Sequence, residues 1–289
     1  MDEDKHSTLL LKDGRILSYA EYGDPHGLPM IGFHGMPGSR LFMKAFGNAA
    51  QAAGVRLIAP ERPGYGYSSA DPGGTLLGYT DDVESLADAL NLERFVVLGA
   101  SGGGPYAQAC AYRLPQRLRL AAMISSTGPF YWPGSMSGMA SVNRRIFTLG
   151  RIAPGLVGFL LPLLIRSSLP SMNQHVQAGT SPNPSLSPKV FAIIAADQAE
   201  AIRAGGKGIV YDMKNYWRPW KINFGEIKLK FMIWHGEADD LAPAASVRHL
   251  ASLLPNCTAT FFPGEGHADA GLKHEQEIMQ SIVREGWNS

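Results

Sequence analysis

Ser101 is the residue whose surroundings most clearly suggest chemistry. It is the middle residue of the pentapeptide GASGG at 99–103, in which glycine lies two positions before and two positions after the serine. An apolar run at 95–100 leads into the pentapeptide, and a helix-like segment at 102–114 leaves it. A serine in such a strand-to-helix turn is held exposed on a strained backbone, and the flanking glycines let the strand and the helix pack closely. The pattern predicts that Ser101 is a nucleophile. A glycine-rich turn with an incidental serine is the alternative.

A serine nucleophile needs a base to take its proton, and histidine is suited to this near neutral pH. Among eight histidines, His267 ends the loop Pro-Gly-Glu-Gly-His, directly after the last apolar run at 259–262. A loop at the carboxyl edge of a sheet can reach the turn that holds Ser101. We therefore predict His267 as the base. His274 is the second candidate, and a surface or core role is the alternative for His267.

The base needs an acid to orient it, and four carboxylates lie near the last two apolar runs: Glu237, Asp239, Asp240 and Glu265. With a serine in this kind of turn, the acid lies between serine and histidine in the chain. We predict Asp239, three residues after Gly236, with Asp240 as the second candidate and an acidic solvated turn as the alternative. The segment 125–128, after the sixth apolar run, contains no carboxylate.

The elements that must position these residues alternate in type. Extended segments are expected at 8–12, 15–22, 29–34, 55–60, 95–100, 120–125, 229–235 and 259–262, and helices at 40–53, 79–92, 102–114, 243–254 and 273–285. This alternation predicts an α/β fold with a mostly parallel eight-stranded sheet and helices on both faces. Asp13-Gly14 is typical of a hairpin turn, so the first two strands should be antiparallel. Thr80, ahead of several carboxylates, is expected to start the helix at 79–92.

The alternation stops in the middle of the chain. Residues 129–221 are helix-like, with a loop composition at 181–188 (SPNPSLSP). We therefore expect one sheet domain, formed by 1–128 and 222–289, with 129–221 inserted as a group of helices. The insertion carries ten Lys and Arg against three Asp and Glu, a net charge of +7, whereas the remainder carries 16 against 22, a net charge of −6. This excess predicts either a solvated basic surface or a mildly positive cover over a pocket.

Composition and charge argue against several classes of function. The net charge of +1 gives no reason to expect nucleic acid as a partner. Two cysteines, Cys110 and Cys257, do not make a disulfide framework and are expected to be core residues. No histidine pair has the spacing of a zinc site and no phosphate-binding glycine motif is present, so we expect neither a metal nor a cofactor. A homodimer is compatible with the sequence, which does not fix the oligomeric state.

The apolar segments of the sequence do not suggest a secreted or membrane-spanning protein. The N-terminal segment MDEDKHSTLLLKDG begins acidic and lacks a long apolar run, so it is not expected to be a secretory signal. The most apolar stretch, at 152–165, is 14 residues long and contains Pro154 and Pro162, so we expect no membrane span. The expectation is a cytoplasmic protein that acts on a small molecule.

Several motifs resemble those of the α/β-hydrolase superfamily, in the family's order along nearly the whole chain: HGMPGSR, PERPGYGYS, GASGGG, HGEADDLAP and GEGH. The loop at 33–38 resembles the family's H-G-x-P loop. The resemblance implies that the backbone N–H groups of Met36 and Gly102 form an oxyanion hole, and that Gly35 lies at the pocket. His34 resembles a residue that braces this loop, and Glu61 a structural residue in the place of the family's usual aspartate. The insertion is similar to the helical cap of proline-iminopeptidase-like members.

The expected function is hydrolysis of a small or medium carboxylic ester, lactone or thioester through an acyl-enzyme. Phe130, Trp132 and Trp217, with other aromatic and Met residues of the insertion, are expected either to line the substrate pocket or to form core. Ser101 stands where dehalogenases and epoxide hydrolases have an aspartate, which disfavours both. Three carboxylates among ten basic residues in the insertion argue against a proline-iminopeptidase-like aminopeptidase. A cofactor-free lyase or peroxidase and a hydrolase-like ligand receptor stay open as alternatives.

Overall fold

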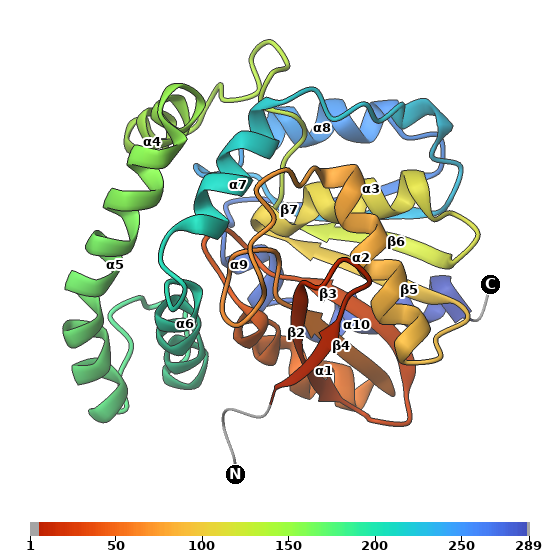
Figure 1. Ribbon diagram of the computed structural model, residues 1–289, viewed down its shortest axis with the longest axis horizontal. Helices are drawn as coiled ribbons and strands as arrows, with labels where there is room; N and C mark the ends of the chain where they lie inside the picture. Colours follow the sequence, from red (N-terminus) through yellow and green to blue (C-terminus); the bar gives the residue numbers. More distant parts are fainter. Residues whose placement is uncertain (1–5, 288–289) are drawn as a thin grey trace.

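The chain is represented by a computed structural model that describes residues 6–287, so residues 1–5 of the N-terminal segment lie outside the described residues. Eight strands form one sheet in the order β1-β2-β4-β3-β5-β6-β7-β8 (Figure 1). Their bounds are β1 (Ser7–Leu10), β2 (Ile16–Gly23), β3 (Leu28–Phe33), β4 (Val55–Pro60), β5 (Phe95–Ala100), β6 (Leu118–Ile124), β7 (Phe231–Gly236) and β8 (Cys257–Phe262). The pairs β1–β2 and β2–β4 are antiparallel and all other pairs are parallel. The prediction of a mostly parallel sheet that opens with an antiparallel pair is confirmed.

Helices cover both faces of the sheet. Side chains of α2 (Leu76–Ala89), α3 (Gly104–Arg113) and α8 (Ala244–Leu253) pack in the core on one face. Those of α1 (Gly47–Ala52) and α10 (Glu275–Trp287) pack in the core on the other face. Every residue of β5 and of β7 is buried, because a central parallel strand is covered on both faces. These two strands lead directly into the segments that contain Ser101 and Asp239.

Two expectations about helices are wrong in detail. Helix α2 begins at Leu76, where the side chain of Thr75 caps it by accepting the N–H of Gly78 at 2.9 Å. Thr80 does not start the helix, because its hydroxyl donates back to the carbonyl of Leu77, one turn earlier, at 2.6 Å. The helix expected at 40–53 is divided into the 3₁₀ helix η1 (Arg40–Phe46) and α1.

Four helices lie between β6 and β7 and form what we name the α4–α7 segment: α4 (Ser141–Ile152), α5 (Pro154–Gln177), α6 (Pro188–Ala201) and α7 (Lys207–Trp217). Three short elements complete the fold: η2 (Ser101–Gly103), η3 (Phe224–Glu226), which lies between α7 and β7, and α9 (Asp269–Leu272). In Figure 1, α5 forms the outer edge of the molecule and α6 and α7 lie between it and the sheet. Helix α5 contacts α6 and α7.

Helix α5 corrects the expectation that the apolar stretch at 152–165 is short and broken. It runs for 24 residues through Pro162 and Pro170, and it is long and apolar enough to cross a membrane by length and composition. Pro162 cannot donate to the carbonyl of Gly158, one turn earlier. That carbonyl faces Gly206, where an added Cβ atom would lie 1.7 Å from its oxygen, so the close approach of the two segments requires glycine at 206.

Candidate active site

The strand-to-helix turn predicted from the sequence is present. Strand β5 ends at Ala100, and Ser101 has φ of +50°, a strained value for a residue with a side chain. A Cβ atom on Gly99 would lie 2.5 Å from the carbonyl oxygen of Gly103, and one on Gly103 would lie 2.2 Å from that of Phe33. Both positions therefore require glycine for the turn to form.

The side chains predicted as nucleophile, base and orienting acid form one hydrogen-bonded chain. The Nε2 atom of His267 lies 2.8 Å from Oγ of Ser101. The Nδ1 atom of His267 lies 2.8 Å from Oδ2 of Asp239. His267 comes from the loop after β8 and Asp239 from the loop after β7, so residues 166 positions apart meet at the carboxyl edge of the sheet.

The surroundings of Asp239 keep its carboxylate charged. Its side chain is fully buried, which by itself raises the pKa, but the hydrogen bond and charge of His267 and the N–H of Ala242 outweigh burial and hold the pKa below its usual value. Its Oδ1 accepts the N–H groups of Leu241 and Ala242 at 2.9 and 2.8 Å. One oxygen is thus fixed by the backbone and the other faces His267, which favours a proton on Nδ1 and leaves Nε2 free to accept from Ser101.

The rival residues are engaged elsewhere. Asp240 is exposed, and Glu237 pairs with Arg248. Glu265 accepts from His274, whose Nε2 lies 2.9 Å from its carboxylate. None of these alternative acids and bases therefore lies in the hydrogen-bonded chain with Ser101.

The residues implied as oxyanion donors lie next to each other beside Ser101. A Cβ atom on Gly102 would lie 3.0 Å from the backbone nitrogen of Met36, and one on Gly35 would lie 3.3 Å from Cβ of Ser101. Tyr216 was not predicted to have a role, but its buried hydroxyl donates to the carbonyl of Gly102 at 3.0 Å. This residue of α7 therefore holds the turn from the side of the α4–α7 segment.

A cavity of about 240 Å³ opens onto Ser101 and His267. Its walls are mostly apolar and include Phe42, Phe46, Ile124, Ile194, Leu241 and Leu272. Gly35 and Met36 lie at its wall, as the resemblance implied for Gly35. The sequence did not indicate the walls supplied by η1 and α6, because neither element has a motif that marks it as part of a pocket.

Three residues expected as possible pocket walls lie elsewhere. Phe130, Trp132 and Trp217 line a separate cavity of about 400 Å³ together with Arg144 and Arg151. Phe130 packs edge-on against Trp217, with ring centroids 5.8 Å apart, and Trp132 packs against Phe224 of the sheet domain. Aromatic packing explains their positions, and they do not line the cavity beside Ser101, so the core alternative fits them better.

Asp197 is the one carboxylate in the wall of the cavity beside Ser101, among its described residues. Its Oδ1 accepts the N–H and the hydroxyl of Ser39 at 2.7 and 2.8 Å. Burial nevertheless raises its pKa to about 7, because the charged form loses its hydration and the hydrogen bonds compensate only in part. The cavity therefore carries a carboxyl group that changes charge near neutral pH.

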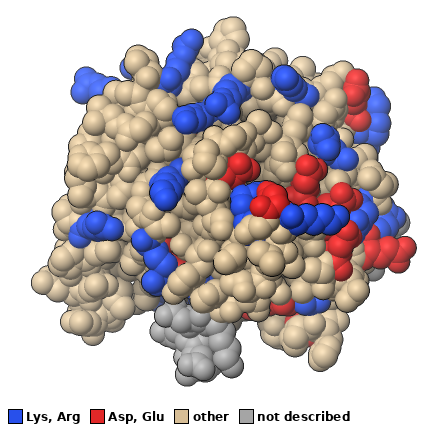
Figure 2. All heavy atoms as spheres, viewed as in Figure 1, with Lys and Arg blue, Asp and Glu red and all other residues tan. Residues whose placement is uncertain are grey.

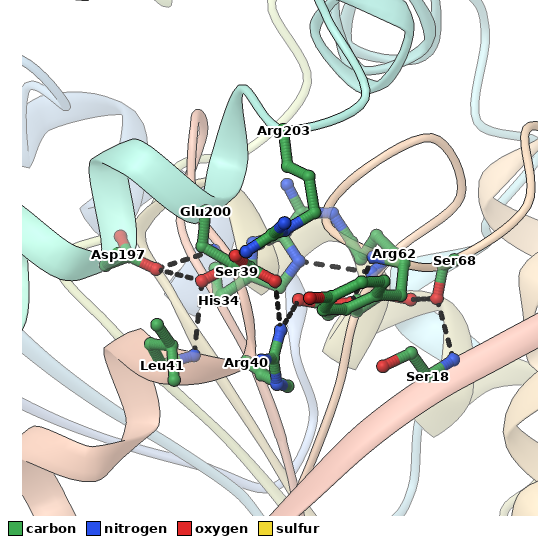
Figure 3. Close-up of polar contacts among 12 residues, drawn as sticks. Ser18, His34, Ser39, Arg40, Leu41, Arg62, Ser68, Asp197, Glu200 and Arg203 are labelled. Atoms are coloured by element: carbon green, nitrogen blue, oxygen red, sulfur yellow. Dashed lines mark hydrogen bonds and ion pairs between the residues drawn. The ribbon is translucent and has the colours of Figure 1, made fainter. Parts of the chain in front are cut away.

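The other two carboxylates of the α4–α7 segment, Glu200 and Asp212, also bind the sheet domain. Figure 3 shows the first of them, with Glu200 facing Arg40. Arg40 of η1 donates at 2.5 Å to both Glu61 and Glu200, and all three side chains are buried. Arg62 donates to Asp212 at 2.5 Å. All three acids of the segment thus point inward to partners in the sheet domain.

His34 and Glu61 have structural positions, in line with the roles that their resemblance implied. The backbone N–H of Arg62 donates to Nε2 of His34 at 3.1 Å. Burial and the charge of Arg62 hold the pKa of His34 well below its usual value, so its ring stays neutral. Glu61 accepts from the N–H of Tyr67 at 2.7 Å, which fixes the turn after β4. Among residues 6–287, no group of three or more His, Cys, Asp or Glu side chains is placed to hold a metal ion.

Comparisons with known proteins show which family the sequence is similar to. The sequence model of the alpha/beta hydrolase fold matches residues 29–272. The chain is 33% identical over 131 residues to the non-heme chloroperoxidase of Streptomyces lividans, an alignment that covers 42% of this chain and 45% of that protein. It is 32% identical over 120 residues to the proline iminopeptidase of Xylella fastidiosa strain 9a5c, covering 39% and 37%. The chain thus matches less than half the length of these curated relatives.

A solved structure extends the likeness to the whole fold. A thermophilic esterase from Thermogutta terrifontis superposes with a TM-score of 0.67 and 21% identity, covering 96% of this chain and 97% of that one. At this level of identity, the likeness concerns the fold alone.

Proposed function

Because the chain belongs to the alpha/beta hydrolase family, we propose that it is a serine hydrolase that cleaves small or medium carboxylic esters, lactones or thioesters through an acyl-enzyme. One observation carries this proposal: the hydrogen-bonded chain Ser101–His267–Asp239 ends at an apolar cavity. A serine hydroxyl becomes nucleophilic when a neutral histidine accepts its proton, and Asp239 fixes the histidine tautomer that can do so.

The proposed reaction has two halves. His267 takes the Ser101 proton as Oγ attacks the ester carbonyl, and the N–H groups of Met36 and Gly102 stabilise the oxyanion. Asp239 stabilises the imidazolium that forms, and His267 then gives its proton to the leaving alcohol. Water repeats the sequence on the acyl-enzyme and releases the acid, with the proton returning to Ser101.

The walls of the cavity support an ester over a charged substrate. Most of the large side chains that line it are apolar, so they favour an acyl or alcohol group of low polarity. An aminopeptidase needs carboxylates that hold a free amino terminus, but Glu200 and Asp212 are already paired with arginines. That leaves Asp197 as the single carboxyl group described in the cavity wall, and it already accepts two hydrogen bonds from Ser39. The epoxide hydrolase reaction is disfavoured because Ser101 replaces the aspartate nucleophile.

The proposal is tested with a fluorophosphonate probe and a panel of p-nitrophenyl esters from acetate to decanoate. We expect one probe molecule per chain, located at Ser101 by peptide mapping, with loss of both labelling and turnover in Ser101→Ala. Aminoacyl p-nitroanilides, halide-dependent peroxidation and lyase substrates are assayed in parallel. Labelling at another serine, or full ester turnover in Ser101→Ala, contradicts the proposal. Stoichiometric labelling without turnover of any substrate favours a ligand receptor.

A further inference from the structure

Apolar side chains form an exposed stripe along α5 that no part of the sheet domain covers. The stripe, which we name the apolar ridge, consists of Ile152 at the end of α4 and Leu156, Phe159, Leu160, Leu163 and Leu164 of α5. Ile152 is 78% exposed, Phe159 64% and Leu164 62%. The α5 residues follow the spacing of one helix face. Of the twelve exposed large hydrophobic residues in the described part of the chain, six belong to this ridge, so it is a continuous patch and not a scatter.

The opposite face of α5 is the one that holds the helix to the molecule. Val157, Gly158, Pro162 and Ile165 are buried, and α5 contacts α6 and α7. Only 22% of the most apolar 18-residue window of α5 is buried, so α5 is not the core helix of a soluble domain. Because one face is packed on neighbouring helices, the helix is placed to lie along an apolar medium and not to cross it alone.

The charge around the ridge has one sign. Helices α4 and α5 contain Arg144, Arg145, Arg151 and Arg166 and no Asp or Glu, and the sequence has no acidic residue from 94 to 196. The three acids of the α4–α7 segment face the sheet domain, where they pair with Ser39, Arg40 and Arg62. In Figure 2 the acidic side chains gather over the sheet domain, whereas the side that carries α4 and α5 shows mainly Lys and Arg among uncharged residues.

We propose that the apolar ridge docks this protein on the surface of a membrane that contains anionic lipids. Helix α5 lies parallel to the bilayer, with the ridge inserted at the boundary between headgroups and acyl chains and the arginines at the level of the lipid phosphates. Apolar burial and attraction of basic residues to anionic lipids act together in such peripheral helices. The surface adds a location to the proposed hydrolase, and it does not depend on which bond Ser101 attacks.

The charge pattern favours a membrane over a second copy of the chain. In a twofold dimer the same patch meets itself. The arginines around the ridge would then face each other without a carboxylate from α4 or α5 between them, and like charges at an interface oppose association. An anionic bilayer offers both an apolar layer and the opposite charge.

The test measures sedimentation of the full chain with vesicles of phosphatidylcholine alone or with 30% phosphatidylglycerol (about one lipid in three anionic). We expect binding to the anionic vesicles that weakens as salt rises, with little binding to neutral ones. Leu160→Gln combined with Leu164→Gln should lower the partition coefficient about tenfold or more. Arg145→Gln combined with Arg166→Gln should lower it only for anionic vesicles. The matched control is Leu10→Gln combined with Leu253→Gln, two exposed leucines far from α5 in the sequence, which should bind as the parent does.

Two outcomes would overturn the proposal. The first is equal vesicle binding by the ridge variant and the parent. The second is no vesicle binding by the parent, together with a dimer in analytical ultracentrifugation that Leu160→Gln and Leu164→Gln abolish. The second outcome makes the ridge an interface between copies. Turnover of a soluble ester and the thermal melt of each variant are recorded separately. A chain that binds vesicles but cleaves no ester supports the docking surface and contradicts only the proposed function.

Discussion

At the scale of single residues, the site depends on two buried carboxylates in different surroundings. Asp239 is surrounded by donors, the backbone N–H groups of Leu241 and Ala242 and the ring of His267, so its pKa is lowered. Asp197 accepts hydrogen bonds from uncharged groups, among them the N–H and the hydroxyl of Ser39, and burial outweighs them, so its pKa is raised to about 7. The charge of the hydrogen-bond partner, and not burial alone, decides the charge of each carboxyl group.

The two adjacent acids after β7 should differ sharply in their effect on turnover. Asp239→Asn places an amide against Nδ1 of His267 and favours the wrong ring tautomer, so we expect kcat to fall on the order of 10⁴-fold. Asp240→Asn should cost at most a few-fold, because an exposed carboxylate acts only through screened charge. The measurement is kcat on one activated ester, with thermal melts as the folding control. If kcat instead falls by that amount in Asp240→Asn, Asp240 is the orienting acid.

Asp197 should make folding less favourable as pH rises. Its pKa is about 7 in the folded chain and about 3.9 when unfolded, so the unfolded state releases this proton first and stability falls between about pH 4 and 7. Asp197→Asn, which keeps an oxygen for Ser39, should therefore match the parent near pH 4 and exceed it by on the order of 2–4 kcal/mol at pH 8. Urea denaturation at the two pH values measures this difference. A gain of the same size at both pH values would show that Asp197 does not titrate in this range.

At the scale of elements, α6 is the part of the α4–α7 segment that reaches the cavity. Ile194, Asp197 and Gln198 of this helix lie in the cavity wall, whereas the aromatic residues around Phe130 pack between α4 and α7. Helix α6 also contacts η1, which supplies Phe42 and Phe46 on the same side of the cavity. Substrate size should therefore be set where α6 meets η1.

Substitutions in α6 and α7 should show which residues set the preference for ester chain length and which only stabilise the fold. Ile194→Ala shortens a side chain of the wall and enlarges the cavity. The ratio of kcat/KM for the octanoate ester to that for the acetate ester should therefore rise several-fold, since one methylene in a pocket commonly contributes about tenfold. Trp217→Ala removes packing against Phe130 and should lower the melting temperature while leaving that ratio unchanged. The ester panel and a thermal melt test both. A changed ratio in Trp217→Ala would instead show that Trp217 lines the substrate pocket.

In the molecule as a whole, three buried carboxylates of the α4–α7 segment bind side chains of the sheet domain. Ser39, Arg40 and Arg62 come from loops and η1 beside the sheet, and Asp197, Glu200 and Asp212 come from α6 and α7. Tyr65 and Tyr106 add hydroxyl donors to Asp212, each at 2.6 Å. Breaking such a buried pair leaves a charge without a partner, which costs far more than the pair itself contributes.

Removal of Asp212 should therefore destabilise the protein strongly. Asp212→Ala leaves the buried Arg62 without its carboxylate, and we expect a loss of about 3–5 kcal/mol in the free energy of unfolding. The control is Arg113→Ala, which breaks an exposed pair with Asp81 and should cost about 0.5 kcal/mol or less. Chemical denaturation of both variants gives the comparison. If the two losses are equal, water must reach Arg62 and screen its charge.

Features that depend on neighbours along the chain could be predicted from the amino-acid sequence. The apolar runs and the glycines at 99 and 103 specified the strands, the turn and the position of Ser101, because period and backbone freedom are local properties. His267 and Asp239 could be selected because each follows a strand whose carboxyl end must lie at one edge of a parallel sheet.

Features that depend on contacts between distant segments became visible only in the three-dimensional packing. It placed Asp197 in the cavity wall and Phe130, Trp132 and Trp217 outside it, since which helix of the α4–α7 segment covers Ser101 follows from packing and not from composition. It also left the apolar ridge exposed. The same leucine spacing suits a buried face equally well, and only the position of α5 at the edge of the molecule shows that nothing in the described chain covers it.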